Sequence, residues 1–179
     1  MRISTATTAT LCWLLGACGG SSPSNPSSTG PGDVSGIWNG TAIVSAATLE
    51  NRNDCSLKVL SDLAATLPST SSITVTLQQH GTAVSGKRTD AATGASCNLS
   101  GSWDGRILSL TEEGCILACS RFSCNGERRD LCRVAGTCTG TATGGRITAS
   151  CGSTWQLQDP FRGTSLGIFT LTGTLRLDR

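Results

Sequence analysis

Apolar and polar residues alternate in repeated runs along this chain, and this period of two predicts β-strands with one buried face. In the clearest run, 132–143, apolar or glycine residues occupy every second position, and threonines fill most positions between them. A first strand carries Trp38, Gly40, Ala42 and Val44 in phase, and a last strand carries Phe169, Leu171, Gly173, Leu175 and Leu177. Together the runs predict eight strands.

The segment 132–157 predicts a hairpin whose register can be specified. With Gly144 and Gly145 as a two-residue turn, Cys138 faces Cys151 and Val134 faces Trp155. The two cysteines then form a non-hydrogen-bonded pair, whose Cα atoms approach to about 4.5 Å. That separation suits a disulfide, so we predict a bond between Cys138 and Cys151.

Two further hairpins are predicted around His80-Gly81 and Asp104-Gly105. The first register places Arg88 opposite Ile73, on the inward face. The second places Leu99 opposite Leu110, also on the inward face.

Two segments interrupt the strands. Leucines recur at helical spacing within 56–66 and Pro68 follows, which predicts a short helix between the first and second strands. The segment from Cys115 to Cys132 is rich in cysteine and arginine, and we expect a disulfide-linked loop there rather than a regular strand.

Eight antiparallel strands joined by short turns leave two unpaired edges unless the sheet closes. We therefore predict an all-β fold, an eight-stranded up-and-down barrel spanning residues 33–179. An interior of this size is either filled by side chains or holds one small ligand. Many inward positions are Gly or Ala, which either leaves room inside the barrel or lets the strands bend sharply.

Gly36, Ile37 and Trp38 resemble the G-x-W element of lipocalin and avidin-like barrels. The resemblance implies that Trp38 closes one end of the barrel and that a basic residue near the chain's end packs on it. Arg179 is in phase with the inward residues of the last strand, so it is the candidate partner. The helix after the first strand is similar to the lid of fatty-acid-binding proteins.

The first residues predict an export signal. Arg2, a short apolar stretch and small residues make residues 1–17 a signal peptide. Leu15, Gly16, Ala17 and Cys18 resemble the bacterial lipobox, which implies a lipid anchor on Cys18; the alternative is an ordinary secretory signal. Residues 18–32 have the composition of a flexible tether. Because Gly19 is not Asp, the resemblance favours the outer membrane of a bacterial envelope.

The barrel region contains an even set of cysteines, which in an exported protein indicates disulfides. They are Cys55, Cys97, Cys115, Cys119, Cys124, Cys132, Cys138 and Cys151. We rank Cys97 with Cys115 next after Cys138 with Cys151. Zinc is the alternative, but the spacings fit zinc ribbons poorly and no histidine is near.

The sequence offers little for catalysis. The single histidine, His80, falls on a predicted turn, and no hydrolase, zinc-protease or phosphate-loop motif is present. We therefore expect no enzyme, no cofactor and no metal site. The net charge of +2 argues against nucleic acid.

Two functions remain. In the first, the barrel binds a small apolar or amphipathic ligand, with Trp38, Arg88 and Trp155 as candidate lumen residues; a cation at Arg88 would orient an anionic head group. The alternative is a protein-interaction or inhibitor module that presents the Cys115 to Cys132 loop to an envelope protein. Its candidate contacts are Arg121, Arg128, Arg129 and Arg133.

Overall fold

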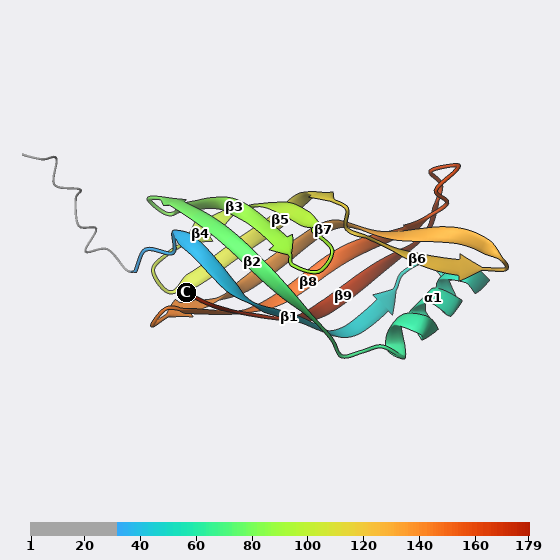
Figure 1. The fold of residues 1–179 in the computed structure, drawn as a ribbon, viewed down its shortest axis with the longest axis horizontal. Coiled ribbons are helices and arrows are strands. Elements are labelled where there is room, and N and C mark those ends of the chain that lie inside the picture. Colours follow the sequence, from blue (N-terminus) through green and yellow to red (C-terminus); the bar gives the residue numbers. More distant parts are fainter. Residues whose placement is uncertain (1–31) are drawn as a thin grey trace, which may run out of the picture.

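The computed structural model describes residues 32–179, which form nine antiparallel strands and one helix. The strands are β1 (Gly36–Leu49), β2 (Ser69–His80), β3 (Ala83–Asp90), β4 (Ser96–Trp103), β5 (Ile107–Ile116), β6 (Cys119–Cys124), β7 (Glu127–Thr143), β8 (Arg146–Gln158) and β9 (Ser165–Asp178), and the helix α1 is Asp54–Ala64. Strands that follow one another in the sequence pair, except that β5 pairs with β7 instead of β6. In addition, β1 pairs with β9. These two pairings close an eight-stranded barrel (Figure 1).

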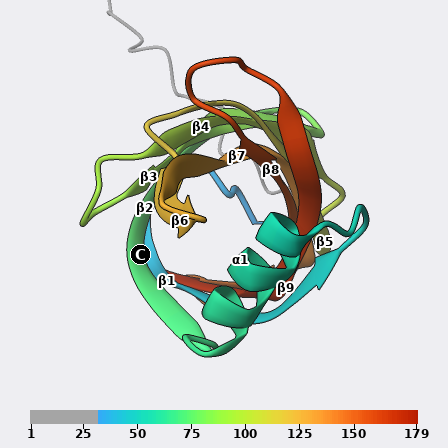
Figure 2. The same cartoon turned by 90° about the vertical axis from the view of Figure 1, so that its right-hand side faces the viewer.

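The strand β6 is the one element of the described sheet outside the barrel. It pairs with the first residues of β7, and this hairpin extends past one end of the barrel, beside α1 (Figures 1 and 2). The expectation of an irregular loop from Cys115 to Cys132 was therefore wrong. Asn125 and Gly126 both have positive φ and form the hairpin turn, and Asn-Gly is a strong signal for such a turn.

The β7–β8 hairpin has the predicted turn and the predicted disulfide. Cys138 faces Cys151 across the strands, with Cα atoms 4.1 Å apart. A β-bulge between Arg133 and Ala135 then shifts the register, so that Trp155 faces Arg133 rather than Val134. The prediction for Val134 was wrong, because the bulge turns this side chain outward, where it is 43% exposed.

The β2–β3 and β4–β5 hairpins differ from the predicted registers by two residues. Arg88 faces Val75 rather than Ile73, and Leu110 faces Gly101 rather than Leu99. A shift of two positions leaves every side chain on its predicted face, because the side-chain period of a strand is two.

Helix α1 begins two residues before the predicted start. The Asn53 side chain accepts a hydrogen bond from the Ser56 backbone, and the Ser56 hydroxyl accepts one from the Asn53 backbone, which forms a capping box. Val59 is fully buried against the barrel strands. The helix lies across the end of the barrel from which β6 projects (Figure 2).

The inward side chains form two hydrophobic clusters. The larger cluster surrounds Trp38 and Trp103 and fills the barrel end that holds the C-terminus. The smaller cluster surrounds Phe169 and Leu157 at the end covered by α1. We call these the closed end and the helix end.

Several predictions concern residues before 32. The signal peptide 1–17, the acylation site Cys18 and the tether up to residue 31 lie outside the described residues. Within residues 32–179, no helix has the length and apolar character needed to cross a bilayer.

Candidate functional site

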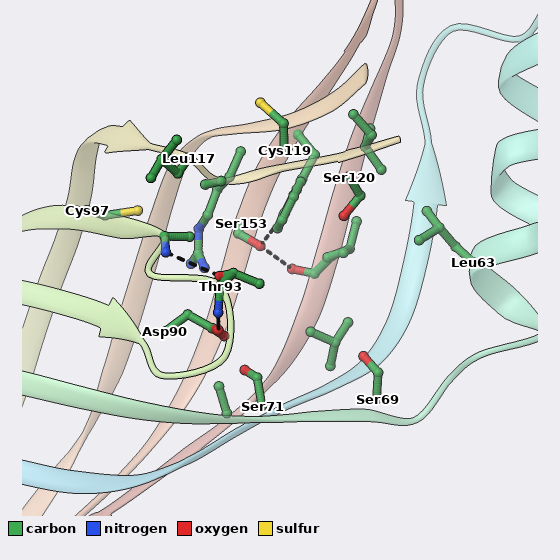
Figure 3. Close-up of a pocket in the computed structure, with 18 of the residues that line it drawn as sticks. Leu63, Ser69, Ser71, Asp90, Thr93, Cys97, Leu117, Cys119, Ser120 and Ser153 are labelled. Carbon is green, nitrogen blue, oxygen red and sulfur yellow. Dashed lines mark hydrogen bonds between the residues drawn. The ribbon is translucent and has the colours of Figure 1, made fainter. Parts of the chain in front are cut away.

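A cavity of about 430 Å³ lies inside the barrel at the helix end (Figure 3). Leu63 of α1 lies on one side, Asp90 and Thr93 of the β3–β4 turn lie on the other, and Ser153 lies between them. The remaining lining is mainly apolar and comes from barrel strands, from β6 and from the β5–β6 connection; it includes Ala42, Val44, Leu117, Phe122, Leu131, Trp155 and Leu171.

The inward residues of β7 and β8 explain why the cavity exists. On β8, Cys151 belongs to the closed-end core and Leu157 to the helix-end core, with Ser153 between them. On β7, Gly136 stands at the corresponding level, opposite Ser153. The small side chain of Ser153 leaves space in the lumen that Leu or Phe would fill, whereas the space next to Gly136 is occupied by Glu112 and Arg133.

Two arginines and one glutamate form a buried ion cluster beside the cavity. Arg88 Nη1 donates to Glu112 Oε1 at 3.0 Å, and Arg133 Nη2 pairs with Glu112 Oε2. Glu112 is only 2% exposed, and it does not line the cavity, whereas both arginines do. The carboxylate therefore lies behind the two guanidinium groups.

Gly136 makes room for this cluster. A Cβ atom at this position would lie 2.7 Å from Glu112 Oε2 and 2.9 Å from Arg133 Nη2. Both are closer than a carbon atom can approach without displacement, so any larger residue would displace the ion pair.

The positive charge of Arg133 is strongly desolvated. Burial, and after it the like charge of Arg88, lower the pKa of Arg133 to about 10, with Glu112 offsetting part of the effect. At neutral pH Arg133 therefore remains charged. Its Nε atom is buried and has no hydrogen-bond acceptor within residues 32–179.

Asp90 is the other charged residue of the cavity lining, and its carboxylate accepts hydrogen bonds from the turn that follows it. Its Oδ1 accepts hydrogen bonds from the backbone of Ala92 and from the backbone and hydroxyl of Thr93. Burial raises the pKa of the Asp90 carboxyl, but these hydrogen bonds outweigh it, and the pKa lies below its ordinary value. The carboxylate therefore stabilises the rim of the cavity.

The candidate lumen residues divide between the two ends. Arg88 and Trp155 line the cavity, and the Trp155 ring lies 6.0 Å from the Arg133 guanidinium carbon. Trp155 Nε1 donates to Ser153 Oγ at 2.9 Å, which orients the ring. Trp38 does not line this cavity, because it lies in the core of the closed end.

Trp38 and Arg179 are in contact at the closed end. The Arg179 guanidinium lies over the Trp38 ring, 4.4 Å from its centroid. Arg179 Nη2 also donates to the backbone oxygens of Asp33 and Ser35, and Trp38 Nε1 donates to the Val34 oxygen. This arrangement ties the two ends of the described chain together across the barrel mouth.

Sequence reasoning missed Glu112. The signal was available, because Glu112 is in phase with the inward residues Leu108 and Leu110. Arg133 was expected in the exposed loop, but the β7 bulge turns it inward, and its side chain is 11% exposed.

The other loop arginines lie on the β6–β7 hairpin. Arg128 pairs with Asp130, and Arg129 pairs with Glu127 and lies 3.7 Å from Asp159. Arg121 is exposed, facing Asp130 across the strands. These acidic neighbours reduce the positive charge that the hairpin presents.

All eight cysteines of residues 32–179 form disulfides. Cys97–Cys115 is present as ranked, Cys119–Cys132 links the β6–β7 hairpin, and Cys55–Cys124 links α1 to β6. Cys97 and Cys119 line the cavity, so these bonds brace its wall.

The fold and the site together define a class: a closed eight-stranded antiparallel barrel with a cavity at one end. Comparison of the chain with protein-family models, curated proteins and solved structures found no match.

Proposed function

We propose that this protein is a noncatalytic ligand-binding barrel that takes a small apolar or amphipathic molecule into the helix-end cavity. The observation that carries the proposal is a cavity of about 430 Å³ with a mainly apolar lining and a few polar groups. Binding sites for small molecules have this composition, with typical volumes of about 300–1,000 Å³.

Native mass spectrometry of the full chain, purified oxidised from a cell envelope, tests this proposal. We expect a noncovalently bound mass that Ala42→Phe removes, because the inward Ala42 lines the cavity. Ile43→Phe is the matched control, since the neighbouring side chain points outward. An Ala42→Phe protein that folds and retains the same bound mass would contradict the proposal.

We further propose that Cys18 carries a lipid that anchors the barrel to a bacterial membrane. The sequence LGAC supports the proposal. The chain leaves the barrel at the closed end, where Asp33 contacts Arg179, and the cavity lies at the other end (Figure 1). Anchored there, the barrel would carry its cavity at the end away from the attachment point.

Fractionation of cells that express Cys18→Ser tests the anchor. We expect the variant to lose the lipid mass and to leave the membrane fraction. Cys12→Ser is the control, because Cys12 lies within the signal segment and should leave the lipid mass in place. Equal amounts of Cys18→Ser and unmodified protein in the membrane fraction would count against anchoring.

A further inference from the structure

The two arginines beside the cavity share a single ion-pair partner. Arg88 and Arg133 carry two positive charges, and Glu112 supplies one negative charge from behind them. Asp90, the remaining charged lining residue, is also ionised, but its carboxylate is hydrogen-bonded to its own turn and forms no ion pair with Arg88 or Arg133. One guanidinium group beside the cavity therefore lacks a carboxylate of its own.

Both arginines also keep unused hydrogen-bond donors. Arg133 binds Glu112 through Nη2, and its buried Nε atom lacks an acceptor within the described residues. Arg88 binds Glu112 through Nη1 alone. A buried donor without an acceptor costs free energy, and native proteins usually satisfy such groups with a protein atom, a water or a ligand.

A purely structural role does not account for two arginines. A single arginine would neutralise Glu112 by a bidentate contact. The second arginine adds a desolvated charge, and the lowered pKa of Arg133 reflects first its burial and then the repulsion between Arg88 and Arg133. Such a charge is retained at low cost only when an anion offsets it.

We propose that the ligand is a monoanionic amphiphile whose carboxylate head lies between Arg88 and Arg133. This inference rests on the proposed function of the cavity and specifies its ligand class. One carboxylate supplies the ion-pair partner that the second guanidinium group lacks, and its planar pair of oxygens matches the geometry of guanidinium donors. The apolar chain then runs past Trp155 and Leu171 toward Leu63 at the helix end.

Glu112 acts as a positioning residue in this site. It holds both guanidinium groups at the cavity wall, and it competes with the ligand for their charge. Replacing Glu112 with glutamine therefore strengthens the binding of an anion while leaving the binding of a neutral amphiphile unchanged.

Titration calorimetry of the full oxidised chain with decanoate and decanol tests the inference. We expect decanoate to bind at least about tenfold more tightly, the ratio that a charged hydrogen bond supplies. Arg133→Met should remove most of this ratio. Arg176→Met, a charge removal on the exposed outer face of β9, should preserve it.

A double variant that leaves the net charge of the cluster unchanged guards against misfolding of a single variant. Arg133→Met combined with Glu112→Gln leaves Arg88 as the single charge of the cluster, and its preference for decanoate should lie between those of the two single variants. Glu112→Gln alone should raise the ratio of decanoate to decanol affinity, an effect that a merely structural ion cluster does not produce.

The outcomes separate this inference from the proposed function. Equal affinity for decanoate and decanol, or a ratio that falls in Glu112→Gln, overturns the carboxylate site and leaves the apolar cavity as a binding site. Failure of both compounds to bind overturns the proposed function as well.

Discussion

The closed end and the helix end are built on the same strands but are stabilised in different ways. At the closed end, large apolar side chains fill the lumen, and Trp38 is 2% exposed beneath Arg179. At the helix end, the lining includes alanine, serine and arginine residues, and a cavity remains. The strand pairings differ as well, because register shifts interrupt the β1–β9, β4–β5 and β7–β8 pairings beside the cavity.

Disulfide bonds are concentrated at the end of the barrel where side chains do not fill the lumen. The Cys138–Cys151 disulfide lies within the closed-end core. The other three disulfides lie at or near the cavity: they brace β4 to β5, β6 to β7 and α1 to β6. A barrel that keeps an internal space thus compensates with cross-links around that space, which limit the freedom of the unfolded chain.

The largest expected loss of stability is at the closed end. Trp38→Ala should lower the free energy of unfolding by about 3–5 kcal/mol, because it removes a buried aromatic side chain and leaves a cavity. Urea denaturation of the oxidised protein measures this loss. Ile37→Ala is the control, since Ile37 is exposed and such surface changes usually stay within about 0.5 kcal/mol. Similar losses in both variants would contradict a packed closed end.

Removal of the helix cross-link should act locally. Cys55→Ala with Cys124→Ala should cost about 2–4 kcal/mol, as is typical for a native disulfide. Hydrogen exchange should then show lost protection in α1 and β6, whereas the closed-end part of β1 keeps its protection. Uniform loss of protection through the barrel would show that the two ends are not separable.

Loss of the closing arginine should be a smaller effect. Arg179→Met removes a cation–π contact and two hydrogen bonds to the backbone, at a cost of about 1 kcal/mol. The urea midpoint should fall, while decanoate affinity stays unchanged because the cavity lies at the other end. A variant with unchanged stability would show that Arg179 is not needed for closure.

The sequence predicts the closed end better than the helix end, and the reasons are physical. Alternation and a glycine turn place Cys138 opposite Cys151, since both signals act over short stretches of chain. Arg133 was assigned to the wrong environment because a single bulged residue reverses the face of the strand beyond it. Cys55 and Cys124 are 69 residues apart, and their pairing depends on where α1 lies over the closed barrel.

Within the candidate site, too, the local strand pattern was predicted but the contact between distant segments was not. Arg88 was predicted to face inward, although its strand register was displaced by two residues. The partner of Arg88 was not predicted, because Glu112 comes from another hairpin, and hydrophobic periodicity carries no information on which polar residues meet across a lumen.

The smallest expected effect concerns the rim of the cavity and depends on pH. The pKa of Asp90 is below its ordinary value of 3.8 in the folded protein, so its ionised form stabilises the fold above that pH. This contribution is lost as the pH falls through the lower, folded pKa. Asp90→Asn should therefore cost about 0.5–1 kcal/mol at neutral pH, and the difference from the unmodified protein should shrink below about pH 4.

Urea denaturation at pH 7 and pH 3 measures this difference. Thr93→Val, which removes one of the three hydrogen bonds, should cost less. A deficit that stays constant between the two pH values would mean that the Asp90 charge does not stabilise the helix-end rim.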